Sequence, residues 1–499
     1  MKKIAFRWKT VLNGICALLA LSSSLQAQVS KDGPDSYQHD AYWASYDSLD
    51  RAKASAPVPK PYSGTTNAEA VPIHAPVGAE AAVPPPVYEY ETTEVGVPEG
   101  LILHRFNQSP AAMAGSNFLG PGSFFANGWI SQGLTYGSGG DYYSPMGLND
   151  QEGYQMNQLY LSLGRRVEKG NQFSIGGQVD LMYGTDYYYM SSVGLETHQN
   201  NTPHWNGHGS DVMYRAGRAE YGAALPQAFG EIYMPFLNGL DFKVGHFNSV
   251  MGYESLQSNS NFFYSRSYTR IYGMPTSMTG AMGELALCNG WKLLFGGVTE
   301  WNAFDSPSDN FSGVLGLNYE SDTKFFTFAI TGMLGDQCAP CYQFETYAEK
   351  SQVFLLNMFA KFQIAPRLSY VCEFTVGNDD RDYFCLETFD MKGGRTWFGL
   401  NNYLFYQVNE QLTLGTRFEW FNDADSTIID GGYGMAFHDG PSNYFALTLG
   451  ANWTPINWIS VRPEIRYDFS DFDCEGMKTY DNFTSDDQLT VGADVIVRF

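Results

Sequence analysis

The chain has 499 residues, of which 53 are acidic and 30 are basic, so its formal net charge at pH 7 is −23. Such an acidic surface makes nucleic acid a poor partner. Aromatic residues form 16% of the chain and glycine contributes 52 residues, a mixture that suits strands with one apolar face and one face in contact with water. Past residue 30, no apolar stretch approaches the roughly 18 residues that a membrane-spanning helix needs.

The first 27 residues have the order of a secretory signal peptide. Four cations precede an apolar run at 11–21, and small residues lead to Ala27, which is the pattern that signal peptidase recognises. A lipoprotein signal at Cys16 would need a different box of small residues before it. We therefore predict cleavage after Ala27 and export of the mature chain.

Residues 28–100 are rich in Pro, Ala, Ser and Glu, as in Pro84-Pro-Pro86, and show no sustained period. This composition is typical of a flexible segment. We predict a periplasmic extension that acts as a linker, with tyrosines such as Tyr42 and Tyr88 leaving open a second interpretation, a segment that binds the cell wall or a partner.

From about residue 124 the pattern changes to segments of about ten residues with period two, the length that a tilted strand needs to cross a membrane. The last segment is the clearest, because Leu489, Val491 and Val495 fall on one face while Thr490 and Asp494 fall on the other. The predicted strands are 126–136, 155–166, 172–184, 226–236, 240–249, 278–287, 291–301, 312–320, 324–335, 351–362, 367–377, 396–406, 411–421, 443–453, 459–469 and 488–499.

The connections between these segments alternate between short and long. The short ones, at 167–171, 237–239, 288–290, 321–323, 363–366, 407–410 and 454–458, hold Gly, Pro, Asn or Asp for tight reversal. A soluble sandwich has no reason to segregate loop lengths by side. We therefore predict that residues 101–499 form an all-β, transmembrane, antiparallel up-and-down barrel of about sixteen strands, with short periplasmic turns and long outer loops.

Charged residues within the strands are predicted to face the lumen, since acyl chains do not tolerate them. The principal lumen-facing charges are Asp180, Lys243, Arg417, Glu419, Arg462, Glu464, Arg466 and Asp494. Acids and bases are comparable in number, so the sign of ion selectivity is undecided. Mutual neutralisation in a plugged lumen is the alternative, whereas a barrel of about sixteen strands is normally wide enough for water.

Residues 228–280 carry a family resemblance through Ala228-Phe-Gly-Glu-Ile-Tyr233, Leu240-Asp-Phe-Lys-Val-Gly-His-Phe247 and Asn261-Phe-Phe-Tyr-Ser265. This stretch resembles the OmpL-like putative β-barrel porin family (porin-2). The terminal Phe499, which ends a period-two strand, is similar to the signal read by the barrel assembly machinery. The resemblance implies a passive channel for small hydrophilic solutes in the outer membrane of a Gram-negative-type envelope, without cofactor. By analogy, porin-like barrels often form homo-oligomers.

The third outer loop, 250–277, can fold inward in porin-like barrels. Here it contains Glu254, Arg266 and Arg270, which would then set a transverse field and narrow the pore, filtering solutes by charge and size. The alternative is an outward loop packed by its own aromatic residues. We predict the inward arrangement, with these three residues at the constriction.

No motif points to a metal site or a catalytic centre. Cys338 and Cys341 form a C-x-x-C pair that we interpret as a structural disulfide or an idle pair. His198, His204 and His208 could ligate a metal, but their spacing matches no rigid site. An exposed polar loop is the simpler account of these histidines.

Two other functions compete with the channel. Long outer loops could serve a surface adhesin or receptor for which the barrel is only an anchor, although Trp205 is weak support for a binding loop. A barrel-embedded hydrolase would need a nucleophile and a positioned histidine, and neither rim candidate, His246 or His438, stands in a recognisable constellation. We therefore predict a channel without enzymatic activity.

Overall fold

The computed structural model describes residues 122–138, 153–197, 204–205, 221–305, 310–338, 350–429, 435–436, 438–481 and 483–499. The predicted signal peptide and the predicted extension at 28–100 lie outside these residues.

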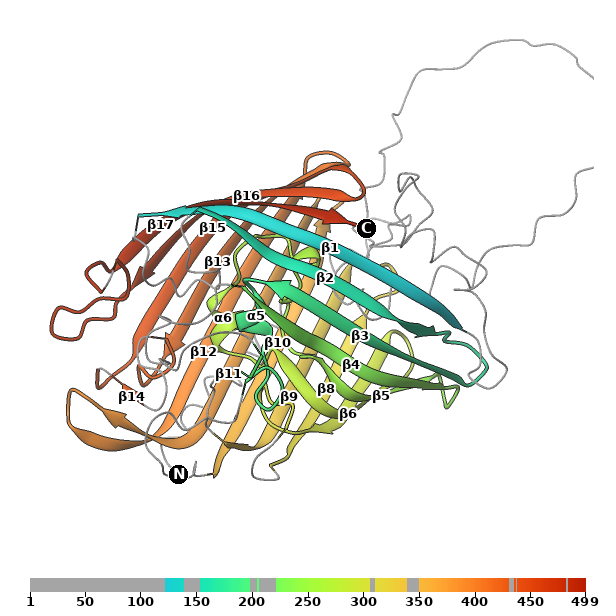
Figure 1. Cartoon of the computed structure of the whole chain (residues 1–499), viewed down its shortest axis with the longest axis horizontal. Coiled ribbons are helices and arrows are strands. Elements are labelled where there is room, and N and C mark those ends of the chain that lie inside the picture. Colours follow the sequence, from blue (N-terminus) through green and yellow to red (C-terminus); the bar gives the residue numbers. More distant parts are fainter. Residues whose placement is uncertain are drawn as a thin grey trace, which may run out of the picture. The chain divides into compact units, whose positions relative to one another are not determined.

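Sixteen antiparallel strands form one closed ring (Figure 1). The first strand pairs with the last from Trp129–Arg498 to Gly137–Thr490, and Gly128 and Phe499 exchange backbone hydrogen bonds of 3.0 and 2.8 Å at the end of the seam. Closure gives each strand of the ring a hydrogen-bonded neighbour on both sides. The strands of the ring are β1 (Gly122–Gly137), β2 (Gly153–Val167), β3 (Ser174–Gly184), β4 (Gly222–Met234), β5 (Leu240–Asn248), β6 (Ser277–Ala286), β7 (Trp291–Val298), β8 (Ser312–Glu320), β9 (Phe326–Cys338), β10 (Lys350–Ala365), β11 (Leu368–Cys385), β12 (Asp390–Gln407), β13 (Leu412–Asp423), β15 (Ser442–Ile456), β16 (Ile459–Ser470) and β17 (Asp487–Arg498).

Each predicted strand corresponds to one strand of the ring, and the short connections stand where the sequence predicts them. One outer connection differs. Residues 378–395, predicted as a loop, continue β11 and β12 as a hairpin to the pair Cys385–Asp390. Residues 378–382 are all polar or charged on both faces, so the apolar period-two signal is missing there. Nearer the tip, Tyr383 and Cys385 are buried against Ala436.

The remaining elements are short. β14 (Met435–Ala436) pairs in parallel with β11, and the helical turns are α5 (Tyr187–Met190), η2 (Ser258–Ser260) and α6 (Tyr268–Tyr272). Within the described part of the chain, no helix has the length and apolarity to cross a membrane.

The two faces of the ring differ as the alternation predicts. In β17, Val491 is 51% exposed on the outside, whereas Asp494 is 1% exposed on the inside. The same holds for Leu449 and Ile465 outside and Arg462 and Glu464 inside. The protein therefore presents an apolar exterior and buries its charges in the lumen.

Candidate functional site

The lumen contains the connection between β5 and β6, which we call loop 3 (residues 249–276). Figure 1 shows its helical turn α6 within the ring of strands, and hydrogen bonds tie the loop to walls on several sides, including Gln158 of β2, Glu373 of β11 and Glu464 of β16. The loop is therefore folded inward.

Glu254 of loop 3 joins the loop to β13. Its Oε1 lies 2.7 Å from Nη1 of Arg417, and its Oε2 accepts a hydrogen bond of 2.7 Å from the Ser267 N–H. Burial by itself would raise the pKa of the Glu254 carboxyl, but the Arg417 guanidinium and the Ser267 N–H outweigh it and hold the pKa below its ordinary value. Arg417 also donates to the Ser265 carbonyl at 3.0 Å and lies 3.1 Å from Glu419.

Arg462 and Glu464 of β16 hold the middle of the loop. The Arg462 Nη1 donates to three loop carbonyls, those of Ser258, Asn261 and Phe263, at 2.8, 2.8 and 3.0 Å. Its Nη2 lies 2.6 Å from Asp494. Glu464 accepts from the Tyr264 and Ser265 N–H groups at 2.8 and 3.1 Å. Each buried charge thus has charged or backbone partners, which offsets its desolvation.

Arg466 of β16 contacts loop 3 close to α6. It binds Asp468, with Nε 2.8 Å from Oδ1, and donates to the Arg266 carbonyl at 2.7 Å. Tyr268 donates its hydroxyl to Asp468 at 2.6 Å, and its backbone N–H donates to Glu419 at 2.7 Å. We call the charged residues on the inner face of β13, β16 and β17 that contact loop 3 or one another the polar wall. They are Arg417, Glu419, Arg462, Glu464, Arg466, Asp468 and Asp494.

Glycines give the loop room to seat against the barrel. A Cβ at Gly133 would lie 2.6 Å from the Tyr264 hydroxyl, and one at Gly415 would lie 2.3 Å from the Phe262 ring. Only glycine therefore permits these close approaches.

Arg266 and Arg270 are 4% and 3% exposed. The Arg266 guanidinium donates to the carbonyls of Tyr264 and Leu256 at 2.6 and 3.2 Å, and Arg270 donates to the Pro275 carbonyl at 2.9 Å. Their positive charges thus lie inside the barrel and help to shape the loop. That they act with Glu254 as a pore constriction stays a prediction.

The two other predicted lumen charges lie on β3 and β5. Asp180 is buried and accepts hydrogen bonds of 2.6 Å from each of Tyr160, Ser162 and Gln227. Lys243 lies 3.7 Å from Glu231.

A cavity of about 470 Å³ lies between loop 3 and the inner face of β5 to β9. Ion pairs stand near the short-turn end, with Lys169 2.9 Å from Asp241 and Lys292 3.0 Å from Glu284. The rest of the lining is mixed. The strands and loop 3 contribute apolar side chains, namely Phe247, Met251, Leu256, Met282 and Leu294, and loop 3 also contributes polar ones that include Glu254, Gln257 and Arg270.

Above the cavity, loop 3 packs on an apolar surface that the sequence analysis did not identify. We call the apolar part of the inner face of β5 to β9 the apolar wall. Its buried members Phe247, Met278, Met282, Leu294, Val298, Val314 and Met333 form one cluster with Met251 and Met274 of loop 3. A lumen of an aqueous channel is expected to be polar, so inward methionines in these strands were not anticipated.

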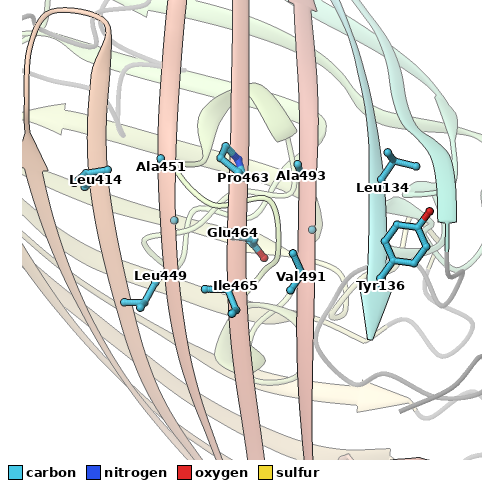
Figure 2. A pocket seen from close by; sticks show the side chains of 12 residues that line it. Leu134, Tyr136, Leu414, Leu449, Ala451, Pro463, Glu464, Ile465, Val491 and Ala493 are labelled. Carbon is cyan, nitrogen blue, oxygen red and sulfur yellow. The ribbon is translucent and has the colours of Figure 1, made fainter. Parts of the chain in front are cut away.

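The outside of the barrel has a shallow apolar groove over β1, β13 and β15–β17. Figure 2 shows Leu449, Ile465 and Val491 side by side on neighbouring strands, with the small or compact residues Ala451, Pro463 and Ala493 next to them. These positions lie on the face that meets the membrane.

The other candidates contribute little to the lumen. The Cys338 side chain, Cys341, His198 and His208 lie outside the described residues, and His204 contacts the Leu195 carbonyl at 3.1 Å. Across the residues described, no group of three or more potential metal ligands occurs. His438 lies 3.1 Å from the exposed Glu387.

His246 is buried between Thr279, 2.8 Å from its Nδ1, and Ser192, 3.4 Å from its Nε2. A catalytic histidine would be oriented by an acid and open to substrate. Here a hydroxyl occupies the orienting position and the ring is enclosed.

A family model described as "Putative beta-barrel porin-2, OmpL-like" matches residues 124–499, which is the whole ring except the first two residues of β1. The comparison with curated proteins found no match.

Several solved structures are similar to this chain. The outer membrane channel DcaP of Acinetobacter baumannii has 8% identity and a TM-score of 0.49, over 78% of this chain and 100% of that one. In-vitro folded OmpT of Vibrio cholerae has 10% identity and a TM-score of 0.46, over 78% and 100%. Salmonella typhi OmpF in complex with daunomycin has 12% identity and a TM-score of 0.46, over 76% and 98%.

Proposed function

Because the chain belongs to the OmpL-like β-barrel porin-2 family and is thus an outer-membrane porin, we propose that it conducts small hydrophilic solutes and ions passively and that loop 3 sets the width of its lumen. The observation that carries this proposal is loop 3 itself, folded across a closed ring and held by Arg417, Arg462 and Glu464. A barrel that only anchored surface loops would not need an internal loop with so many charged contacts.

The first test is single-channel recording of the refolded mature protein in a planar bilayer. Stable ohmic current steps in KCl are expected from an aqueous pore. A barrel that inserts and stays electrically silent would contradict the proposal and would favour the anchor function.

A second test concerns the predicted constriction charges. The double variant Arg266→Gln with Arg270→Gln removes two positive charges from the lumen, so the reversal potential in a KCl gradient should shift toward cations. The matched control is Lys392→Gln with Lys478→Gln, which removes two cations from exposed outer pairs with Asp439 and Asp473. An equal shift in both double variants would show that the loop arginines have no special part in selectivity.

We also propose that the protein is not an enzyme. His246 has Thr279 rather than a carboxylate on its Nδ1, which supports a structural role for this histidine. Turnover of phospholipid or peptide by the purified barrel, abolished by His246→Gln, would contradict this.

The proposed partners follow from the surface. The apolar exterior with Leu449 and Val491 would contact acyl chains, and Phe499 would be recognised by the barrel assembly machinery. A homo-oligomer would bury part of the groove in Figure 2. The mass of the detergent-extracted native protein distinguishes a monomer from an oligomer.

A further inference from the structure

Loop 3 is held in two different ways by the two sides of the lumen. On the polar wall, guanidinium and carboxylate groups make directional contacts, such as the three carbonyls bound by Arg462. On the apolar wall, Met251 and Met274 of the loop belong to one cluster with Met278, Met282 and other buried side chains. This cluster continues through the loop to Phe421 of β13 and Tyr444 of β15. The ring order places β5–β9 and β13–β17 on opposite sides.

These two kinds of contact respond differently to a solute. When a solute displaces a charge-assisted hydrogen bond, the interaction is lost unless a polar group of the solute reproduces its geometry. An apolar contact is non-directional, and the unbranched methionine side chain adapts to new neighbours. A solute with an apolar face can therefore take the place of the loop against the apolar wall and restore the buried apolar area. A wholly polar solute of the same size cannot.

The cavity below the loop has matching chemistry. Its mouth carries paired opposite charges, Lys169 with Asp241 and Lys292 with Glu284. Farther in, the strand side is lined by Met282 and Leu294, and loop 3 contributes both apolar side chains such as Met251 and the charged pair Glu254 and Arg270. A volume of about 470 Å³ is within the usual range of small-molecule sites, roughly 300–1,000 Å³. Opposite charges at the mouth suit a zwitterion, and the methionines suit an apolar group attached to it.

We propose that the permeation route follows the apolar wall and that Met251, Met282 and Leu294 make it selective for small zwitterionic solutes with an apolar side group. This inference rests on the proposed channel function and narrows its solute class. Loop 3 stays clamped to the polar wall, and the route lies along the loop's methionine side.

Current block by two amino acids tests the proposal. Phenylalanine and glutamine are both zwitterions without a charged side chain, and only phenylalanine, the larger of the two, has an apolar side group. In wild-type channels conducting KCl, phenylalanine should halve the current at a concentration about fivefold lower than glutamine does. In Met282→Gln this ratio should fall below about twofold, because a polar group then stands in the apolar lining.

Two variants serve as controls. Met282→Leu keeps an apolar side chain of similar volume and should retain the wild-type ratio. Met391→Gln makes the same chemical change at an outer hairpin position that is 57% exposed, and should also retain it. The folded state of each variant is checked by the mobility of unheated protein on a denaturing gel.

The outcomes separate the two proposals. The proposed solute class would be wrong if wild-type channels conduct KCl but are blocked equally by both amino acids. It would also be wrong if Met282→Gln keeps the wild-type ratio. Neither result would contradict the proposed channel function. Absence of any KCl current would contradict the proposed channel function and, with it, the proposed permeation route.

Discussion

Glu254→Gln is the sharpest test of how loop 3 is held. The substitution keeps the size and shape of the side chain and removes its charge, so the ion pair of 2.7 Å with Arg417 is lost. Arg417 keeps Glu419 at 3.1 Å and the Ser265 carbonyl at 3.0 Å. The guanidinium is therefore not left without a partner, and the penalty stays below that of breaking an isolated buried pair.

The magnitude follows from the two contacts of Glu254. A hydrogen bond to a charged group contributes about 1.5–3 kcal/mol, and the glutamine oxygen can still accept from the Ser267 N–H. We expect the docked loop to lose about 2–3 kcal/mol, which raises the released fraction about 30- to 160-fold. The ring of strands should remain folded, because its backbone pairing does not involve Glu254.

Limited trypsin digestion measures this release. Arg266 and Arg270 are buried in the docked loop, so cleavage after them requires the loop to open and its rate follows the open population. Mass spectrometry should show these two cuts appearing about 30- to 160-fold faster in Glu254→Gln. The control is Glu387→Gln, a carboxyl that is 42% exposed. Unchanged cleavage of a folded Glu254→Gln barrel would refute the clamp.

Three further predictions concern the membrane face, the cavity mouth and acid. Leu449→Arg places a cation against acyl chains and should cost about 2–4 kcal/mol of barrel stability in a urea titration, whereas Phe389→Arg, at a hairpin position that is 80% exposed, should cost nothing measurable. Lys169→Gln removes the partner of Asp241, 2.9 Å away, and should move the reversal potential toward cation selectivity. The pKa of Glu254 lies below its ordinary value of 4.5, so the ion pair with Arg417 stabilises the docked loop above pH 4.5 and loses this effect as the pH falls through the lower folded-state pKa. Open-channel noise should therefore stay constant down to pH 4.5 and rise below it. A rise that begins near neutrality would contradict this.

The sequence by itself determined the barrel. Period-two alternation is a local property of each strand, so Val491 outside and Asp494 inside could be assigned without knowing any neighbour. Turn residues are equally local, and the short connections and the closing strand that ends at Phe499 were found for that reason. The hairpin at 378–395 was missed because residues 378–382 are polar or charged on both faces and leave no apolar alternation to detect.

Only the tertiary structure decided how the lumen is filled. Inward methionines such as Met278 and Met282 look in sequence like any apolar residue of a strand, and nothing local shows that loop 3 will cover them. The partners Glu254 and Arg417 are 163 residues apart and meet because ring closure brings β13 opposite the loop. Period two assigns a side chain to one face of a sheet, whereas its partner across the lumen depends on strand order, register and the path of the loop, which are properties of the closed ring.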